Sequence, residues 1–513
     1  SNTVYEILRQ LDSVNVNYLV IEPAKGEYKN IFGHHPDVTV LGTNPAYTAL
    51  LRINPFRFPK GVHVLEHIDR LIEIFNVCWP MYAAMPAVLK DAVLQAYEVC
   101  GWDLVESKNT VDEDLFPTFQ DLLTELVDVI DNSAYHNEVK SNYKGSLETR
   151  VKSLTNGLNG QIFSTDEIGD KTLFDTKVII DLSRIGSLET KALIMGILVM
   201  RLNEYRMTEH TGMNVPLKHV TVLEEAHNIL KRTSTEQNPE GSNLAGKSVE
   251  MLSNAIAEMR TYGEGFIIAD QSPSAVDVSA IRNTNTKIIM RLPDESDRRF
   301  AGKSAALKDE QLDEIAKLPK GVAVVYQNDW LEPVLCKVRQ FSGSEKPYAY
   351  DRYSQVASVN CDKWFKTELL KLLVKGLVVE QIDIDIDEMK ENVSVVNLST
   401  KNKIGIHHIL NEYGHTGRLS LWEVVNFEPL SSLIGELLQS ENKVNRFVRE
   451  SQNFDELSAK LYSLIDNQTE DIAKEVCLAV SQCLMKNYSI EGTENIEVYS
   501  AWRETVKKRG SLL

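Results

Sequence analysis

The chain has 513 residues, 43% of them hydrophobic, which suits two to four domains that each have enough apolar side chains for a core. Its formal net charge of −18 argues against a surface covered in basic side chains for nucleic acid, although a local basic lining fits within that total. The apolar stretch from Ala192 to Met200 is far shorter than the ~20 residues that cross a bilayer, and the 6 cysteines lack CxxC spacing, so we expect no membrane segment and a reduced, cytoplasmic protein.

The first residues resemble the end of a phosphate-binding loop followed by a helix. Apolar residues recur at helical spacing from Val4 to Leu11, directly after Ser1, Asn2 and Thr3. In a loop of the form G-x-x-x-x-G-K-[ST], Ser1 is the hydroxyl ligand of Mg²⁺, and Asn2 and Thr3 belong to the nucleotide-binding end. The alternatives are residues left by tag removal or an ordinary N-cap. Under the loop interpretation the chain is a fragment without its phosphate cradle, and we expect it to bind ATP poorly.

Two apolar runs follow, residues 17–22 and 38–42, and both are typical strands of a covered sheet. Lys25 and Glu27 lie in the loop after the first run. This loop can reach the ligand crevice at the carboxyl edge of a parallel sheet, so both residues are candidate nucleotide-binding residues. The alternative is an ordinary polar loop.

Helical spacing replaces strand patterns from about residue 62 to 155, where we predict a helical insertion. The sheet then resumes. Its predicted elements are a strand at 176–182, a helix at 188–207, a strand at 217–223, a helix around 249–259, strands at 265–270 and 286–291, a helical stretch at 294–316, and a hairpin of 321–326 with 331–338. Strands alternating with helices predict a mostly parallel α/β sheet layered by helices over residues 1–340. A polar linker around 341–345 leads to a mainly helical C-terminal domain over residues 345–513.

Glu224 and Glu225 end the predicted strand at 217–223 and give the strongest functional signal. Two carboxylates at the end of a buried strand are costly without a cation or partner, whereas the rim of a parallel sheet offers a ligand crevice. Glu224 is then the Mg²⁺ ligand, and Glu225 polarises the attacking water. The alternative is a solvated acidic turn. We interpret the pair as an ATPase signature.

Three more residues are catalytic candidates. Gln271 ends the strand expected beside the Glu224 strand, where an amide can sense the γ-phosphate or orient water, although it can also cap the Ser-Pro turn that follows. Arg260 and Arg291 can supply a guanidinium to a neighbouring subunit's nucleotide, since arginine has the forked geometry that suits phosphoryl oxygens. Ordinary ion pairs are the alternative for both arginines.

Taken together, these segments resemble the HerA/FtsK superfamily of ring-forming ATPases, and within it the HerA-like branch. The matching motifs, in chain order, are SNT, IEPAKGEY, INPF, LEEAHNIL, EMRTYG, ADQSPS and NTNTKIIMRL. Two features depart from the family. Relatives usually have Asp at the position of Glu224, and the glycine-rich loop and N-terminal barrel are absent. The predicted C-terminal helical domain has no match that we can name.

The resemblance implies a RecA-like P-loop NTPase core with a helical insertion. It implies a homohexameric ring that binds ATP and Mg²⁺ between subunits and moves double-stranded DNA, with a nuclease or an NAD-hydrolase effector, in DNA processing or phage defence. Glu224 then aligns with the Mg²⁺ acid, Glu225 with the catalytic base, Gln271 with the sensor, and Arg260 or Arg291 with the arginine acting in trans. Two alternatives stay open: a conjugation or secretion ATPase, and a scaffold subunit gated by nucleotide.

Overall fold

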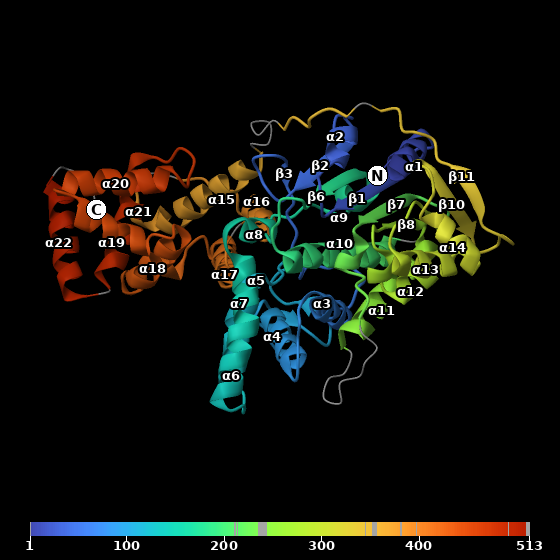
Figure 1. Ribbon diagram of the computed structural model, residues 1–513. Helices are drawn as coiled ribbons and strands as arrows, with labels where there is room; N and C mark the ends of the chain where they lie inside the picture. Colours follow the sequence, from blue (N-terminus) through green and yellow to red (C-terminus); the bar gives the residue numbers. More distant parts are fainter. Residues whose placement is uncertain are drawn as a thin grey trace. The chain divides into compact units, whose positions relative to one another are not determined.

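The computed structural model describes residues 2–209, 212, 214–233, 244–343, 345–350, 357–379, 382–396, 398–490 and 492–508. The chain divides into two compact units (Figure 1). Unit 1 comprises Ser1–Thr110 and Phe116–Arg352, and unit 2 comprises Val111–Leu115 and Tyr353–Leu513. Among the described helices, none is long and apolar enough to span a membrane.

A six-stranded sheet in the order β3-β2-β6-β1-β7-β8 forms the centre of unit 1. All its neighbouring strands are parallel. The strands are β1 (Asn17–Glu22), β2 (Val38–Gly42), β3 (Ala49–Leu50), β6 (Lys177–Asp181), β7 (His219–Glu224) and β8 (Glu264–Ala269). β1, β6 and β7 are almost wholly buried, as expected for parallel strands that are covered on both faces. The predicted fold class is confirmed.

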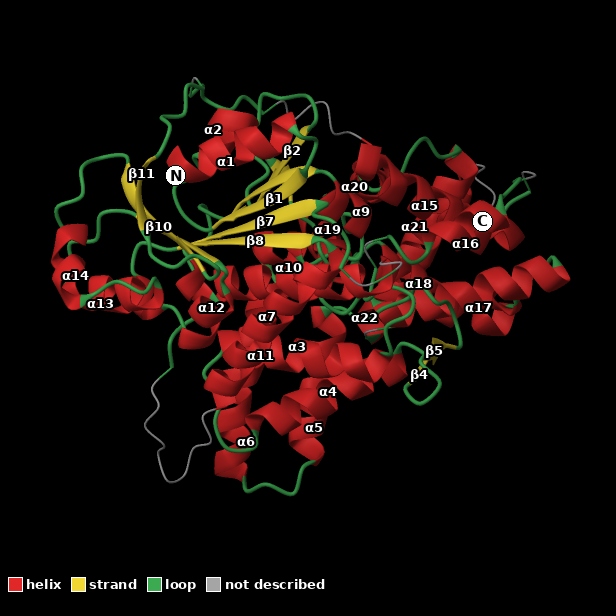
Figure 2. Ribbon diagram, turned by 90° about the vertical axis from the view of Figure 1, so that its right-hand side faces the viewer, coloured by secondary structure: helices red, strands yellow, loops and turns green. Residues whose placement is uncertain are grey.

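Helices cover both faces of the sheet (Figure 2), and successive side chains of β1 alternate between two cores. Tyr18 and Val20 pack with α1 (Asn2–Ser13) and α2 (Tyr28–Phe32) on one face of the sheet. Leu19 and Ile21 belong to a larger core on the other face, which includes α10 (Leu188–Glu209) and α11 (Leu244–Glu258). α10 is buried over most of its length, because the sheet covers one side of it and the helical insertion packs on another.

The helical insertion extends the larger core away from the sheet. Its elements are α3 (Val64–Cys78), α4 (Met85–Val99), β4 (Trp102–Asp103), β5 (Lys108–Asn109), α5 (Phe119–Asn132), α6 (Asn137–Tyr143), the π-helical turn η1 (Lys144–Glu148), α7 (Thr149–Thr155), α8 (Gly157–Ile162) and α9 (Asp170–Asp175). Thr118 starts α5 with a capping box, its side chain and that of Asp121 each accepting from the other's backbone N–H. The β4–β5 hairpin was not predicted from the sequence.

A separate three-stranded sheet, β11-β10-β9, ends the α/β part of unit 1. The predicted hairpin is confirmed as β10 (Val322–Gln327) and β11 (Val334–Lys337). β9 (Thr286–Ile289) pairs antiparallel with β10, although the alternating pattern predicted that it belonged with the parallel strands. α12 (Val278–Asn283) precedes β9, and α13 (Glu295–Ser304) and α14 (Asp309–Ile315) follow it.

Unit 2 is helical around its own core. Its helices are α15 (Ala357–Val374), α16 (Ile386–Asn392), α17 (Thr400–Thr416), α18 (Phe427–Leu437), α19 (Glu441–Glu450), α20 (Phe454–Asp466), α21 (Lys474–Ser489) and α22 (Thr493–Lys508). α21 is largely buried and packs against α15, α18, α19, α20 and α22. Trp502 of α22 is fully buried, and its indole N–H donates to the hydroxyl of Ser458 on α20 at 3.0 Å.

Candidate functional site

Acidic side chains gather at the carboxyl edge of the parallel sheet. Glu22 ends β1, Asp181 ends β6 and Glu224 ends β7, while Asp270 directly follows β8. The strand register pairs Glu22 with Asp181 and Glu224 with Ala269, so all four acids lie at one edge. Ligands of open parallel sheets bind outside this edge. Glu224 therefore lies at the carboxyl edge of the parallel sheet.

Glu22 and Asp181 are held in different protonation environments. The Glu22 carboxylate accepts from the backbone N–H of Glu27 at 2.8 Å and of Tyr28 at 3.2 Å. Burial, reinforced by the charges of Asp181 and Glu224, nevertheless raises the pKa of Glu22 to about 7. Burial also opposes ionisation of Asp181, but hydrogen bonds from Lys29 and Ser183 outweigh it and hold the pKa of that carboxyl below its usual value.

Tyr28 connects Glu224 to the first helix. The buried Tyr28 hydroxyl donates to Glu224, and burial together with the Glu224 charge raises the pKa of the phenol. The Tyr5 ring of α1 packs edge-on against Tyr28, with centroids 4.9 Å apart, and the Tyr5 hydroxyl donates to Glu27 at 3.2 Å. α1, α2 and the end of β7 are thereby joined through aromatic hydroxyls.

Glu225 has a left-handed backbone, with φ 48° and ψ 51°. A residue with a side chain rarely adopts this conformation, and such strain persists where the surroundings enforce it. The strained residue lies between the end of β7 and the short 3₁₀ turn η2 (Ala226–Asn228). The side-chain amide of Gln271 donates to the Glu225 carboxylate. Glu225 follows β7 and Gln271 lies two residues after β8, and these two strands are neighbours, as expected.

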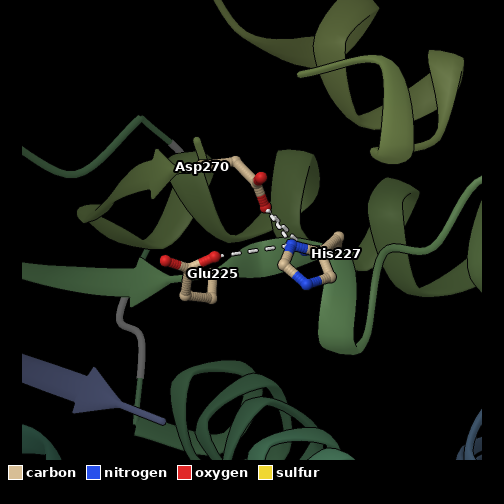
Figure 3. Close-up of side chains that lie close together, drawn as sticks. All are labelled: Glu225, His227 and Asp270. Atoms are coloured by element: carbon tan, nitrogen blue, oxygen red, sulfur yellow. Dashed lines mark hydrogen bonds and ion pairs between the residues drawn. The ribbon is translucent and has the colours of Figure 1, made fainter. Parts of the chain in front are cut away.

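Asp270 and His227 form a clamp beside Glu225 (Figure 3). One Asp270 oxygen accepts from the His227 backbone N–H at 2.9 Å and lies 2.8 Å from His227 Nδ1. The other oxygen accepts from the Ser272 N–H at 2.9 Å. Asp270 therefore fixes both the turn that follows Glu225 and the turn that carries Gln271.

The Asp270–His227 clamp also approaches metal-binding geometry. His227 Nδ1 lies 3.7 Å from a Glu225 oxygen, and one donor atom each from Glu225, His227 and Asp270 fit within 4.8 Å of one another. The 2.8 Å contact between His227 and Asp270 has the length of a hydrogen bond, whereas two ligands that share a zinc ion lie roughly 3.3 Å apart. We therefore describe Asp270 and His227 as a hydrogen-bonded clamp that lies beside Glu225.

The predicted residues at the start of the chain lie partly outside this edge. Ser1 is outside the described residues. The Asn2 side chain donates to the carbonyl of Arg339 at 3.2 Å and accepts from the N–H of Phe341 at 2.9 Å. The Thr3 hydroxyl lies 3.9 Å from the sulfur of Met290. Asn2 and Thr3 thus bind neighbouring segments of unit 1.

The structure does not bring Arg260 to the acidic edge. Arg260 lies in η3 (Met259–Tyr262), just before the amino end of β8, whose six residues span roughly 20 Å. Arg291 follows β9 and is next in the chain to Met290. Both are exposed, and neither makes an ion pair with any described residue. Lys25 is also exposed and has a left-handed backbone, with φ 66°.

Comparisons with known proteins identify relatives of this chain. No family model matches it. The DNA double-strand break repair helicase HerA of Sulfurisphaera tokodaii is 22% identical over 352 residues, which cover 67% of this chain and 63% of that protein. Over two thirds of its length the chain is thus similar in sequence to a HerA helicase. The chain spans less than two thirds of the length of this relative.

Matches among solved structures have low sequence identity. VirB4 of Thermoanaerobacter pseudethanolicus is 15% identical with a TM-score of 0.49, and the match covers 66% of this chain and 87% of that one. Plasmid coupling protein TrwB in complex with ADP and Mg²⁺ is 13% identical with a TM-score of 0.44, covering 68% and 84% of the two chains.

Proposed function

We propose that this HerA-like chain is the motor part of an ATP-hydrolysing translocase or helicase that acts on double-stranded DNA. The supporting observation is the pair Glu224 and Glu225 at the carboxyl edge of β7, with Glu225 strained and fixed against Gln271. Named relatives that are DNA repair helicases support the same class of activity.

The acidic edge suits a hydrated divalent cation. Mg²⁺ prefers carboxylate oxygens and water, and Glu224, Asp181 and Glu22 offer carboxylates on three adjacent strands. We assign Glu224 as the residue that holds the cation, and Tyr28 orients its carboxylate. Bound Mg²⁺ neutralises charge on the nucleotide phosphates. Lys25 and Glu27 follow β1 at the same edge, and their nucleotide contacts are part of this proposal, as is the Mg²⁺ contact of Ser1.

Glu225 is the proposed general base. A carboxylate accepts a proton from water only if it is held within hydrogen-bond reach, and the clamp of Asp270 and His227 fixes the turn beside it. Gln271 donates to Glu225, so its amide is in position to exchange that contact for a phosphate oxygen or the attacking water.

We further propose that the motor is a homohexamer. Arg260 lies at the opposite edge of the sheet from Glu225, so it can reach a nucleotide only in another subunit. Arg291 is a second candidate for this arginine in trans. Association with a nuclease or NAD-hydrolase effector, in DNA processing or phage defence, stays a prediction.

The test is ATP hydrolysis by the full-length protein with and without duplex DNA. Glu225→Gln removes the proton acceptor and keeps the side-chain size, so turnover should fall by roughly two to four orders of magnitude while nucleotide binding persists. Glu258→Gln is the control, because Glu258 is exposed at the far end of α11. Unchanged turnover in Glu225→Gln would remove Glu225 from the mechanism, and activity indifferent to DNA would favour a nucleotide-gated scaffold.

A further inference from the structure

Helices α19 and α20 of unit 2 line a cavity of about 350 Å³. This volume falls at the lower end of the range of small-molecule sites. The lining residues are Lys443, Arg446, Phe447, Lys460, Ser463, Leu464, Asn467 and Gln468. Three of them are cations and none is an acid, in a chain whose net charge is −18.

The cations of this basic pocket are only partly neutralised. Lys460 pairs with Glu456 at 2.9 Å, and Arg446 lies 3.9 Å from Glu450; both partners are one turn away on the same helix and outside the lining. Pairs that are partly or fully exposed to water contribute little to stability. Lys443 makes no ion pair with any residue that the structure describes.

A fourth cation adds to the like-charge cluster. Lys366 of α15 is half-buried, and burial lowers the pKa of its ammonium group; Asp362 opposes this effect and the charge of Lys443 adds to it. Like charges held together in a partly desolvated place weaken the fold unless an anion joins them. The cluster of Lys366, Lys443, Arg446 and Lys460 is thus suited to an oxyanion with several charged oxygens.

The remaining lining residues indicate what accompanies that oxyanion. Phe447 and Leu464 form an apolar wall, and the guanidinium carbon of Arg446 lies 5.7 Å from the centre of the Phe447 ring. Gln468 is fixed by donating to the Leu438 carbonyl at 2.9 Å. An aromatic ring beside cations and polar side chains is the combination that binds a base and its phosphate.

We propose that the basic pocket of unit 2 binds a phosphorylated group of nucleotide size, with the phosphate on Lys443, Arg446 and Lys460 and the base against Phe447. Two sources offer this chemistry: a free mononucleotide and the 5′-phosphorylated end of a nucleic acid strand. The proposal rests on unit 2 alone and is independent of ATP hydrolysis at the sheet.

The test uses the full chain and a thymidine trinucleotide labelled at its 3′ end, measured by fluorescence anisotropy. We expect the 5′-phosphorylated trinucleotide to bind at least tenfold more tightly than the unphosphorylated one. Lys443→Gln combined with Arg446→Gln should abolish that difference. Lys401→Gln combined with Arg418→Gln, at exposed positions of unit 2 outside the pocket, should preserve it. Competition with thymidine monophosphate separates the two sources: an affinity equal to that of the phosphorylated trinucleotide identifies the free nucleotide, and an affinity at least tenfold weaker identifies the strand end.

Equal affinity of the pocket variant and the native chain for the phosphorylated probe would overturn the proposal. The thermal midpoint of the variant separates loss of the pocket from misfolding, because removing like charges should leave the midpoint unchanged or higher. A second measurement, the salt dependence of binding, should show a shallower slope in the variant, since it has lost two cationic contacts.

Discussion

Asp270 acts on the proposed chemistry through two other residues. It holds the backbone and ring of His227 and the N–H of Ser272, and so fixes the turns that carry Glu225 and Gln271. Sequence reasoning found Glu225 and Gln271 because acid and amide side chains at strand ends are visible in the sequence. It missed Asp270 and Tyr28, since neither sequence distance nor residue type reveals which groups they contact.

Asp270→Asn should separate positioning from binding. An amide at this place keeps one acceptor oxygen but loses the charge that holds His227, so Glu225 becomes less well placed. We expect the kcat for ATP to fall about 10- to 100-fold with KM little changed. Steady-state kinetics measure this, and Asp277→Asn, at the N-cap of α12, is the control for a general loss of folding. If Asp270→Asn and Asp277→Asn lose activity and thermal stability to the same extent, the role of Asp270 is structural only.

Glu22 gives the fold a pH dependence near neutrality. Its pKa is raised from 4.5 to about 7 in the folded protein. The folded state therefore binds a proton at Glu22 more tightly than the unfolded state does. Protonation of Glu22 stabilises the fold at low pH, and this contribution to the free energy of unfolding is lost as the pH rises through 7. In Glu22→Gln, the change in the free energy of unfolding over this pH range should be smaller by about 3 kcal/mol. Urea unfolding between pH 5 and 9, with a chelator present, measures it, and a profile identical to that of the native chain would show that Glu22 does not titrate there.

At the scale of elements, the turn before β8 sets where this strand begins, and Asp270 and Gln271 directly follow the strand. Gly263 has φ 84°, and a Cβ there would lie 2.5 Å from the carbonyl oxygen of Pro216. Gly263→Ala should lower the free energy of unfolding by about 1 to 3 kcal/mol. At Gly186 a Cβ meets no atom within 4 Å, so Gly186→Ala is the matched control. Chemical denaturation compares the two, and equal stability would show that the turn relaxes freely.

Element positions along the chain were predictable because apolar periodicity is local. The helix at Leu188–Glu209 and the strand at His219–Glu224 appear close to their predicted bounds. Strand partners were less predictable. β9 has the same apolar sequence pattern as the parallel strands before it, yet it pairs antiparallel with β10. Pairing depends on which strand edge the chain reaches when it returns to a sheet, and the local pattern does not determine this.

At the scale of the whole molecule, the sequence predicted an α/β part followed by a helical part, but not the path between them. The segment Val111–Leu115 lies in the middle of unit 1 in sequence and belongs to unit 2 in space. Within unit 2, Asp112 lies 3.1 Å from the His407 ring, and this hydrogen bond holds the pKa of the Asp112 carboxyl below its usual value. No local sequence pattern predicts such a long-range contact.

This path has a practical outcome for anyone dissecting the protein. The backbone passes from one unit to the other at residues 110–111, 115–116 and 352–353, so no single cleavage yields two intact pieces. A recombinant fragment of residues 345–513 would lack Leu115, which is 1% exposed in the intact chain. Supplying a peptide of residues 108–118 should raise the melting temperature of that fragment, and a scrambled peptide should not.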